Sequence, residues 1–365
     1  MARILHLIPG LTGGGAERQL TLLALAQVAR GHEVHIGVSR SELPETLVGN
    51  CSVRVHVMAT NGNHDPMLFL RIRKLIRSSR ADIVQTWLTM MDVAGGIAAF
   101  STGTPWILSE RSEAAAYPST FKNSVRVQIG RSAKAIVANS PGGVSYWSRA
   151  GVSEKKLALV PNAVDAVSIA NARAAQLPAT LLGKPLVLFV GRLSEEKMPF
   201  VLIDALASVL RTTDAIALLA GVGPLEQEMR GAIRRHGLEA RLMLTGHRDD
   251  IFGLMRAASV CVALSRFEGN PNVALEAMAA GCPLVVSDIA GYRQLLDDAT
   301  ALFVPVSDVD AAARAIVNVL NNPDTARSRA ALAQTRVAQY APSHIAASLD
   351  ALYAAVLPTM HVVIQ

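Results

Sequence analysis

Short apolar runs alternate with longer stretches of helical periodicity along the whole chain. The runs are rich in Val, Ile and Leu and are bounded by polar residues, which predicts buried strands. In the first half they cover residues 3–8, 33–38, 53–57, 82–86, 105–109 and 134–139. In the second half they cover residues 185–190, 215–220, 241–244, 259–264, 283–287 and 301–304. Because these runs are continuously apolar, we expect parallel sheets with helices on both faces.

The strand–helix alternation occurs twice, which predicts an α/β protein made of two doubly wound, Rossmann-like domains. A chain of 365 residues is long enough for two such domains. We expect residues 1–165 to form the N-terminal domain and residues 166–342 the C-terminal domain. A final helix with one apolar face is predicted over residues 343–357.

Composition and charge narrow the class of protein. The chain is 51% hydrophobic and 18% charged, which is typical of a folded protein with large cores. Its three cysteines lack metal-site spacing, and no apolar run reaches the length of a membrane span. We therefore expect a cytoplasmic protein.

The positive charge is concentrated in the first half of the chain. Residues 1–165 hold 18 Lys and Arg against 11 Asp and Glu, whereas the remaining residues hold 17 against 18. This excess predicts an anionic partner for the first half. Nucleic acid is not expected as that partner, because aromatic residues make up only 4% of the chain and do not interleave with basic ones.

A glycine-rich segment, GGGAER, follows the first predicted strand and begins a helix. Gly14 and Gly15 would let the backbone approach a phosphate, and the helix N-terminus supplies partial positive charge. The segment is not the GxGxxG fingerprint of dinucleotide-binding proteins. A simple connecting loop is the alternative.

Two further loops follow the first two strands of the C-terminal half. The segment GRLSEEK begins at Gly191 and places Arg192 and Lys197 where both could bind one diphosphate, Arg with a planar fork and Lys as a point charge. The segment GVGPL, which contains Gly223, should lie at the same sheet edge. A solvated turn is the alternative for the charged segment.

The most specific motif is FEGNPNVALE, residues 267–276. Asn270 and Pro271 should prevent any earlier helix, so a helix begins near Asn272 and ends at Gly281. Glu268 precedes this helix and Glu276 lies about one turn inside it. A glutamate at the start of an otherwise apolar helix indicates a polar ligand, although two surface glutamates are the alternative. The residues expected to bind this ligand are Glu268, Gly269, Asn270, Pro271, Asn272, Val273 and Glu276.

With these motifs the chain resembles the retaining glycosyltransferases of the GT-B fold, family 4 type, also called glycosyl transferases group 1. Glu268 and Glu276 form an E-x7-E pair, and GRLSEEK and GVGPL stand in the family's order. Other segments agree in order: GGGAER, DIVQTW, ANS, VPNAVD, TGHRDD and AMAAGCPLVVSDIAG. The resemblance covers essentially the whole chain. It implies two domains facing a cleft, with residues 343–365 packing back onto the N-terminal domain.

The resemblance also implies roles for donor-binding residues. Arg192 and Lys197 would bind the donor diphosphate and offset charge on the leaving group, so that no metal or other cofactor is needed. Glu276 would bind the nucleotide ribose, and Glu268 the hydroxyls of the donor sugar. The amides of Asn272 and Val273, and Gly14 and Gly15 from the other domain, would reach the phosphates.

One departure from the family concerns the segment after strand 105–109. Many relatives place a histidine there, near the sugar and the acceptor, whereas this chain has Ser109-Glu110-Arg111-Ser112. Either Glu110 or Arg111 would take part of that catalytic role, or the acceptor is handled differently. Trp87 and Asp92 are expected to line the same cleft, with a core position as the alternative for Trp87. His247 is expected near the donor base.

The implied function is transfer of a sugar from a nucleoside-diphosphate sugar, with UDP as the default nucleotide, to a glycan or a lipid-linked acceptor. Two alternatives remain: a nucleotide-sugar 2-epimerase of the same fold, and a non-catalytic sugar-nucleotide-binding protein.

Residues 68–80 carry five Arg or Lys on a helical stretch with an apolar face. They are expected to contact the anionic inner membrane surface, with an ordinary solvated helix face as the alternative.

Overall fold

The computed structural model describes residues 1–44, 47, 52–60, 65–112, 117, 120–177 and 183–357, so that residues 358–365 of the predicted C-terminal segment lie outside it. The chain divides into two compact units, which are described separately. Unit 1 comprises Met1–Ala163 and Pro342–Gln365, and unit 2 comprises Val164–Ala341. These divisions lie one or two residues before the domain boundaries expected from the sequence.

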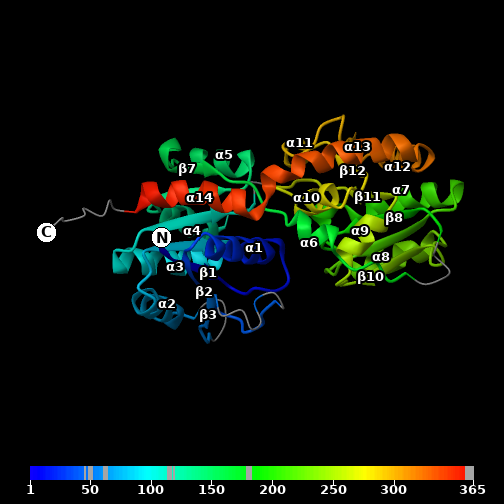
Figure 1. Cartoon of the computed structure of the whole chain (residues 1–365). Coiled ribbons are helices and arrows are strands. Elements are labelled where there is room, and N and C mark those ends of the chain that lie inside the picture. Colours follow the sequence, from blue (N-terminus) through cyan, green and yellow to red (C-terminus); the bar gives the residue numbers. More distant parts are fainter. Residues whose placement is uncertain are drawn as a thin grey trace. The chain divides into compact units, whose positions relative to one another are not determined.

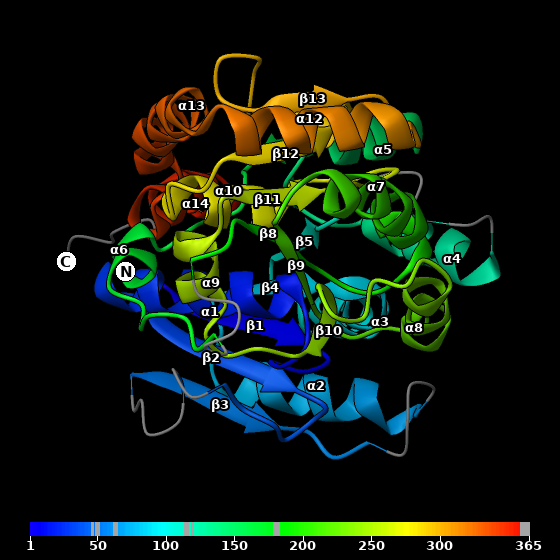
Figure 2. The ribbon, with the colours of Figure 1, turned by 90° about the vertical axis from the view of Figure 1, so that its right-hand side faces the viewer.

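Unit 1 contains a seven-stranded, wholly parallel sheet of order β3-β2-β1-β4-β5-β6-β7. Its strands are β1 (Arg3–Ile8), β2 (Glu33–Val38), β3 (Val53–Val57), β4 (Ile83–Trp87), β5 (Trp106–Glu110), β6 (Ala135–Ala138) and β7 (Leu157–Leu159). Figure 2 shows β1, β2 and β3 side by side. β7 was not predicted, because this three-residue edge strand is partly exposed along its length and lacks a buried apolar run.

Unit 2 contains a six-stranded, wholly parallel sheet of order β10-β9-β8-β11-β12-β13. Its strands are β8 (Leu186–Val190), β9 (Ile216–Ala220), β10 (Leu242–Gly246), β11 (Val260–Ala263), β12 (Leu284–Ser287) and β13 (Leu302–Val304). The two parallel sheets confirm the predicted α/β class, and each strand expected from the apolar runs is present with ends shifted by no more than two residues.

Helices connect the strands in both units. In unit 1 they are α1 (Gly15–Ala29), α2 (Met67–Ser78), α3 (Leu88–Thr102), α4 (Phe121–Gly130), α5 (Pro141–Arg149) and α14 (Pro342–Val356). In unit 2 they are α6 (Ala166–Ala170), α7 (Pro199–Thr212), α8 (Glu226–Arg235), α9 (Ile251–Ala257), α10 (Asn272–Ala279), α11 (Ala290–Arg293), α12 (Val309–Asn321) and α13 (Pro323–Thr335). Each sheet separates two apolar clusters, which explains why its strands are apolar on both faces.

The C-terminal helix α14 packs beside α1 in unit 1 (Figure 1). Its Tyr353 is buried and accepts a hydrogen bond of 2.8 Å from Gln27 Nε2 on α1. The same hydroxyl donates to Gln85 Oε1 on β4. The final segment of the chain is therefore joined to unit 1 by specific polar bonds as well as by apolar packing.

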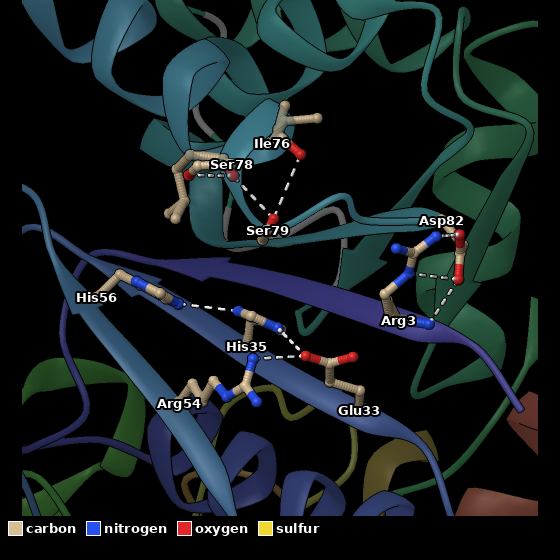
Figure 3. Close-up of polar contacts among 10 residues, drawn as sticks. Arg3, Glu33, His35, Arg54, His56, Ile76, Ser78, Ser79 and Asp82 are labelled. Carbon is tan, nitrogen blue, oxygen red and sulfur yellow. Dashed lines mark hydrogen bonds and ion pairs between the residues drawn. The ribbon is translucent and has the colours of Figure 1, made fainter.

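Polar side chains also link neighbouring strands of the unit 1 sheet (Figure 3). Arg3 Nη2 on β1 donates to Asp82 Oδ1, just before β4, at 2.7 Å. On β2 and β3, the ring nitrogens His35 Nδ1 and His56 Nε2 lie 2.9 Å apart, and Glu33 accepts a 2.6 Å bond from Arg54. Among the described residues, no helix has the length and apolar character needed to cross a membrane.

Each sheet has one topological switch point, where the strand order reverses direction. In unit 1 it lies between β1 and β4, and in unit 2 between β8 and β11. Open parallel sheets bind ligands outside the carboxyl ends of the strands at such points. The segments that follow these four strands are therefore the place to examine for a site.

Candidate active site

Backbone hydrogen bonds hold three segments together at the switch point of unit 2. Leu193, after β8, donates from its amide to the carbonyl of Val222, after β9, at 3.0 Å, and the amide of Leu225 donates back to Leu193 at 3.1 Å. The amide of Arg266, after β11, donates to the carbonyl of Glu196 at 2.8 Å. A Cβ on Gly223 would lie 2.3 Å from the carbonyl oxygen of Leu193, so this close approach requires glycine. The motifs GRLSEEK, GVGPL and FEGNPN thus form one structural group.

Lys197 and Glu268 meet within this group. Lys197 Nζ donates to Glu268 Oε1, and Ser265 Oγ donates to the same oxygen at 2.8 Å. The two side chains keep 21% and 14% of their surface exposed, so both remain open to a ligand. The next residue, Met198, adopts the left-handed conformation with a φ of 45°, where a non-glycine residue is strained. Arg192, on the same segment, is exposed, and Gly191 lies at its start.

The start of α10 follows β11 on the other side of the switch point. Asn272 is its first residue and Val273 its second, and Pro271 precedes the helix with a φ of −71°. Asn270 and Glu276 are buried, with 5% and 6% of their surface exposed. A helix N-terminus carries partial positive charge and outward-facing amides, which suits an anionic group.

Two residues that the sequence interpretation did not single out also position Glu268. Ser265 bonds to its carboxylate, and the Ser265 amide donates to Ser287 Oγ at 3.0 Å. Gly291 packs so tightly that a Cβ there would lie 2.4 Å from the Glu268 carbonyl oxygen. A signal for each was available, because Ser265 stands three positions before Glu268 and Gly291 ends the AMAAGCPLVVSDIAG segment.

His247 lies apart from this group. It follows β10, two strands beyond β8 in the sheet. Its side chain is 81% exposed and its Nε2 lies 3.3 Å from Asp249 Oδ1. A contact with the donor base stays a prediction.

In unit 1, the glycine-rich segment follows β1 at the switch point. Gly13 has a φ of 96°, a conformation that favours glycine. Gly14 is the extended residue that precedes α1, and Gly15 begins the helix. The backbone here places glycines at a helix N-terminus, where a phosphate can bind, and the role itself stays a prediction.

The cleft position expected for Trp87 and Asp92 stays a prediction, with a core position as the alternative for Trp87. Both are interior residues, with 2% and 1% of their surface exposed. Trp87 Nε1 donates to His6 Nδ1 at 3.2 Å. Asp92 Oδ2 accepts a 2.7 Å bond from Arg126 Nε. Asp92 and Arg126 join α3 to α4, which pack together, whereas Trp87 belongs to the apolar cluster that also contains residues of α1 and α14.

The side chain of Glu110 is completely buried, and its expected share of the catalytic role stays a prediction. Arg111, the next residue, lies over the ring of Trp87 at 5.0 Å and its Nη2 donates to Asn162 Oδ1. Burial lowers the pKa of Arg111 to about 10, so it stays charged at neutral pH. Of the two residues expected to replace the histidine of relatives, only Arg111 keeps part of its surface exposed.

The described residues contain no group of three or more His, Cys, Asp or Glu arranged to hold a metal ion.

Family models match both halves of the chain. Residues 13–167 match the model Glycosyltransferase Family 4, and residues 184–322 match the model Glycosyl transferases group 1. The chain belongs to the family 4 glycosyltransferases.

Curated relatives of this glycosyltransferase are themselves glycosyltransferases. An Escherichia coli UDP-Gal:α-D-GlcNAc-diphosphoundecaprenol α-1,3-galactosyltransferase is 26% identical over 71% of each chain. A Campylobacter jejuni α-1,4-N-acetyl-D-galactosaminyltransferase, named for a diphosphate-undecaprenol-linked glycan, is 28% identical over 94% of this chain and 96% of its own.

Solved structures place the glycosyltransferase in the GT-B fold. Anabaena HepE in complex with UDP and glucose has a TM-score of 0.84 at 22% identity, covering 97% of this chain and all of its own. Sucrose-phosphate synthase from Thermosynechococcus elongatus has a TM-score of 0.82, also at 22% identity, with 97% and 99% covered. At this level of identity the likeness concerns the fold alone.

Proposed function

We propose that this glycosyltransferase moves a sugar from a UDP-sugar to a lipid-linked glycan acceptor, with retention of anomeric configuration and without a metal. The observation that carries the proposal is the ion pair of Lys197 and Glu268 across the switch point of unit 2. It puts a cation beside a carboxylate where doubly wound sheets bind nucleotides. The cation of Lys197 would neutralise charge on a diphosphate, and the carboxylate of Glu268 would accept hydrogen bonds from sugar hydroxyls.

In the proposed reaction an acceptor hydroxyl oxygen bonds to the anomeric carbon as the bond between that carbon and the diphosphate oxygen breaks. Negative charge develops on the leaving diphosphate, which takes up the hydroxyl proton. Lys197 and Arg192 offset that charge, as preorganised cations do in other transfer reactions. The amides at the start of α10 add partial positive charge, Glu268 binds hydroxyls of the donor sugar, and Glu276 binds the ribose.

The acceptor class is supported by the relatives. The E. coli and C. jejuni enzymes are both named for acceptors joined to undecaprenol through a diphosphate. Unit 1 carries the basic excess of the chain, which suits an acceptor with a diphosphate group. Arg111 is the acceptor-side residue in this proposal.

The donor is tested by thermal shift with UDP-, GDP- and ADP-sugars, because a ligand that binds only the folded state raises stability by mass action. At 100 times its Kd a donor should add about 2.7 kcal/mol. Stabilisation by a UDP-sugar is the expected result. Stabilisation by GDP- or ADP-sugars alone would contradict the choice of nucleotide.

The reaction is tested with UDP-galactose or UDP-N-acetylgalactosamine and a short-prenyl diphosphate carrying one N-acetylhexosamine. We expect transfer, an α-linkage in the product by NMR, and equal rates with and without EDTA. Conversion of the donor to its epimer without acceptor would favour an epimerase instead. A protein that binds UDP-sugars yet transfers nothing across the acceptor panel would be a binding protein.

We also propose that α2 brings unit 1 to an anionic membrane surface. One face of α2 is buried in the protein through Leu68, Ile72, Leu75 and Ile76. The outer face forms a shallow hollow of about 450 Å³ lined by Leu70, Arg73, Lys74, Arg77 and Ser78. Basic residues beside exposed apolar ones are typical of helices that bind anionic lipid.

This contact is tested by flotation with vesicles of phosphatidylglycerol and phosphatidylethanolamine. Lys74→Glu with Arg77→Glu should abolish flotation, because both side chains are exposed and together supply about 2 kcal/mol of attraction. Lys122→Glu with Lys134→Glu is the matched control, since it makes the same charge change at exposed positions elsewhere in unit 1. Equal loss in both double variants would show only a general effect of net charge.

A further inference from the structure

Glu110 is the last residue of β5 and pairs in register with Ala138 at the end of β6. It therefore stands at the sheet edge where doubly wound folds bind ligands. Yet none of its surface is exposed. A carboxylate in this position requires protein partners, because an unpaired buried charge is very costly.

Four donors satisfy the carboxylate. Oε2 accepts 2.9 Å bonds from Arg126 Nη1 on α4 and from Trp147 Nε1 on α5. Oε1 accepts a 2.9 Å bond from the amide of Ser112 and a 2.5 Å bond from the hydroxyl of Tyr117. An ionised carboxylate has about four acceptor positions, so Glu110 has none left for a substrate.

On the Oε2 side of Glu110, Arg126 belongs to a buried network of further polar bonds. Arg126 is 1% exposed and bonds Asp92 Oδ2 on α3 as well as Glu110. Thr86 Oγ1, on β4, donates to the other oxygen of Asp92 at 2.8 Å. Burial acts to lower the pKa of Arg126, but the carboxylates of Asp92 and Glu110 outweigh it and raise the pKa well above its ordinary value. Three helices and two strands thus fix Glu110 in place.

On the Oε1 side, Glu110 binds two residues that follow β5, Ser112 and Tyr117. Ser112 and Tyr117 are five positions apart and both donate to the single oxygen Oε1. The ring of Tyr117 also lies 4.7 Å from the guanidinium of Arg126. Arg111 stands between Glu110 and Ser112, so its backbone is fixed on both sides, and its side chain is directed over Trp87 toward Asn162.

We propose that Glu110 is a positioning residue for the acceptor: by binding Ser112 and Tyr117 with one carboxylate oxygen it sets the place of Arg111. The inference rests on the proposed function, in which Arg111 faces the acceptor. It assigns to Tyr117, Arg126 and Asp92 a part in acceptor binding that acts through Glu110 rather than by contact with the substrate.

The test uses a double-mutant cycle on the full chain, with the UDP-sugar and the short-prenyl diphosphate N-acetylhexosamine named above. Tyr117→Phe removes one bond to Oε1 but keeps the ring against Arg126. It should raise the KM for the acceptor about tenfold, with the KM for the donor and the slow hydrolysis of the donor by water unchanged. Arg111→Ala should raise the acceptor KM at least as much.

The double variant should be no worse than Arg111→Ala alone, because both changes remove the same interaction. Tyr340→Phe, a tyrosine of unit 2 with 8% exposure, is the control and should leave all of these constants unchanged. An unchanged acceptor KM in Tyr117→Phe, or effects that multiply in the double variant, would overturn the positioning role alone. If the wild-type protein transfers no sugar to the probe, the proposed function fails and the inference falls with it.

Discussion

Lys197 and Glu268, which lie 71 positions apart in the chain, form an ion pair. They come from the segments after β8 and β11, the two neighbouring strands at which the sheet order of unit 2 reverses. Without a donor, each residue neutralises the other. A bound UDP-sugar would offer Lys197 a diphosphate and Glu268 a set of hydroxyls. Each side chain could then exchange its ion-pair partner for a group of the donor at little electrostatic cost.

Lys197→Ala should lower kcat about 100- to 1000-fold, because the charge that develops on the leaving diphosphate would lose a preorganised cation. The measurement is steady-state transfer to the lipid-linked probe. Lys184→Ala removes an exposed lysine elsewhere in unit 2 and should leave kcat unchanged. Full activity of Lys197→Ala would remove the main support for the proposed mechanism.

Gly291→Ala should displace Glu268, because the new Cβ would lie 2.4 Å from the Glu268 carbonyl oxygen. We expect a lower kcat for transfer with little change in the Kd for UDP, since UDP lacks the sugar that Glu268 is proposed to bind. Gly231→Ala is the matched control, because its Cβ would meet only the end of a flexible arginine on α8. That control should be fully active and slightly more stable.

Glu276→Gln should weaken UDP binding about tenfold and leave binding of inorganic pyrophosphate unchanged. The reason is that Glu276 is proposed to accept hydrogen bonds from the ribose, and a bond to a charged group contributes about 1.5–3 kcal/mol. Isothermal titration calorimetry with the two ligands measures both affinities. Equal losses for UDP and pyrophosphate would instead assign Glu276 to the diphosphate or to the packing of α10.

Unit 1 should lose stability in acid through His6. Burial lowers the pKa of His6 to about 4 from 6.5, and its Nδ1 accepts a bond from Trp87 that protonation would break. The folded state therefore binds fewer protons than the unfolded state between pH 6.5 and 4. Stability should fall by about 3 kcal/mol as the pH falls through this range.

The measurement is denaturant unfolding followed by tryptophan fluorescence, because Trp87, Trp106 and Trp147 all lie in unit 1. His6→Gln should show a flatter pH dependence. Burial raises the pKa of Asp92 to about 6, and this contribution has the opposite sign, being lost as the pH rises from 3.8 to 6. It is common to both proteins and cancels in their difference, so identical profiles would contradict the role of His6.

Arg126→Met should cost unit 1 about 3–5 kcal/mol, because Asp92 and Glu110 would remain buried without their cation. The same fluorescence experiment measures this loss. Adding Asp92→Asn to Arg126→Met should recover part of it, since one of the two stranded charges is then absent. A smaller loss of stability in Arg126→Met alone would mean that the two carboxylates are protonated or reached by water.

The sequence by itself determined the fold and which motifs lie at the switch point of unit 2. A run in which every position is apolar indicates a strand buried on both faces, as in a parallel sheet covered by helices. Lys197 and Glu268 follow such runs, so the sequence places both at the edge of the sheet where doubly wound folds bind ligands. Only the tertiary structure decided what Glu110 does. Two of its partners, Arg126 and Trp147, come from α4 and α5, and nothing in the local pattern SERS shows that they will close over it. Local periodicity reports which face of a segment is buried, whereas the pairing of buried charges depends on how distant helices pack.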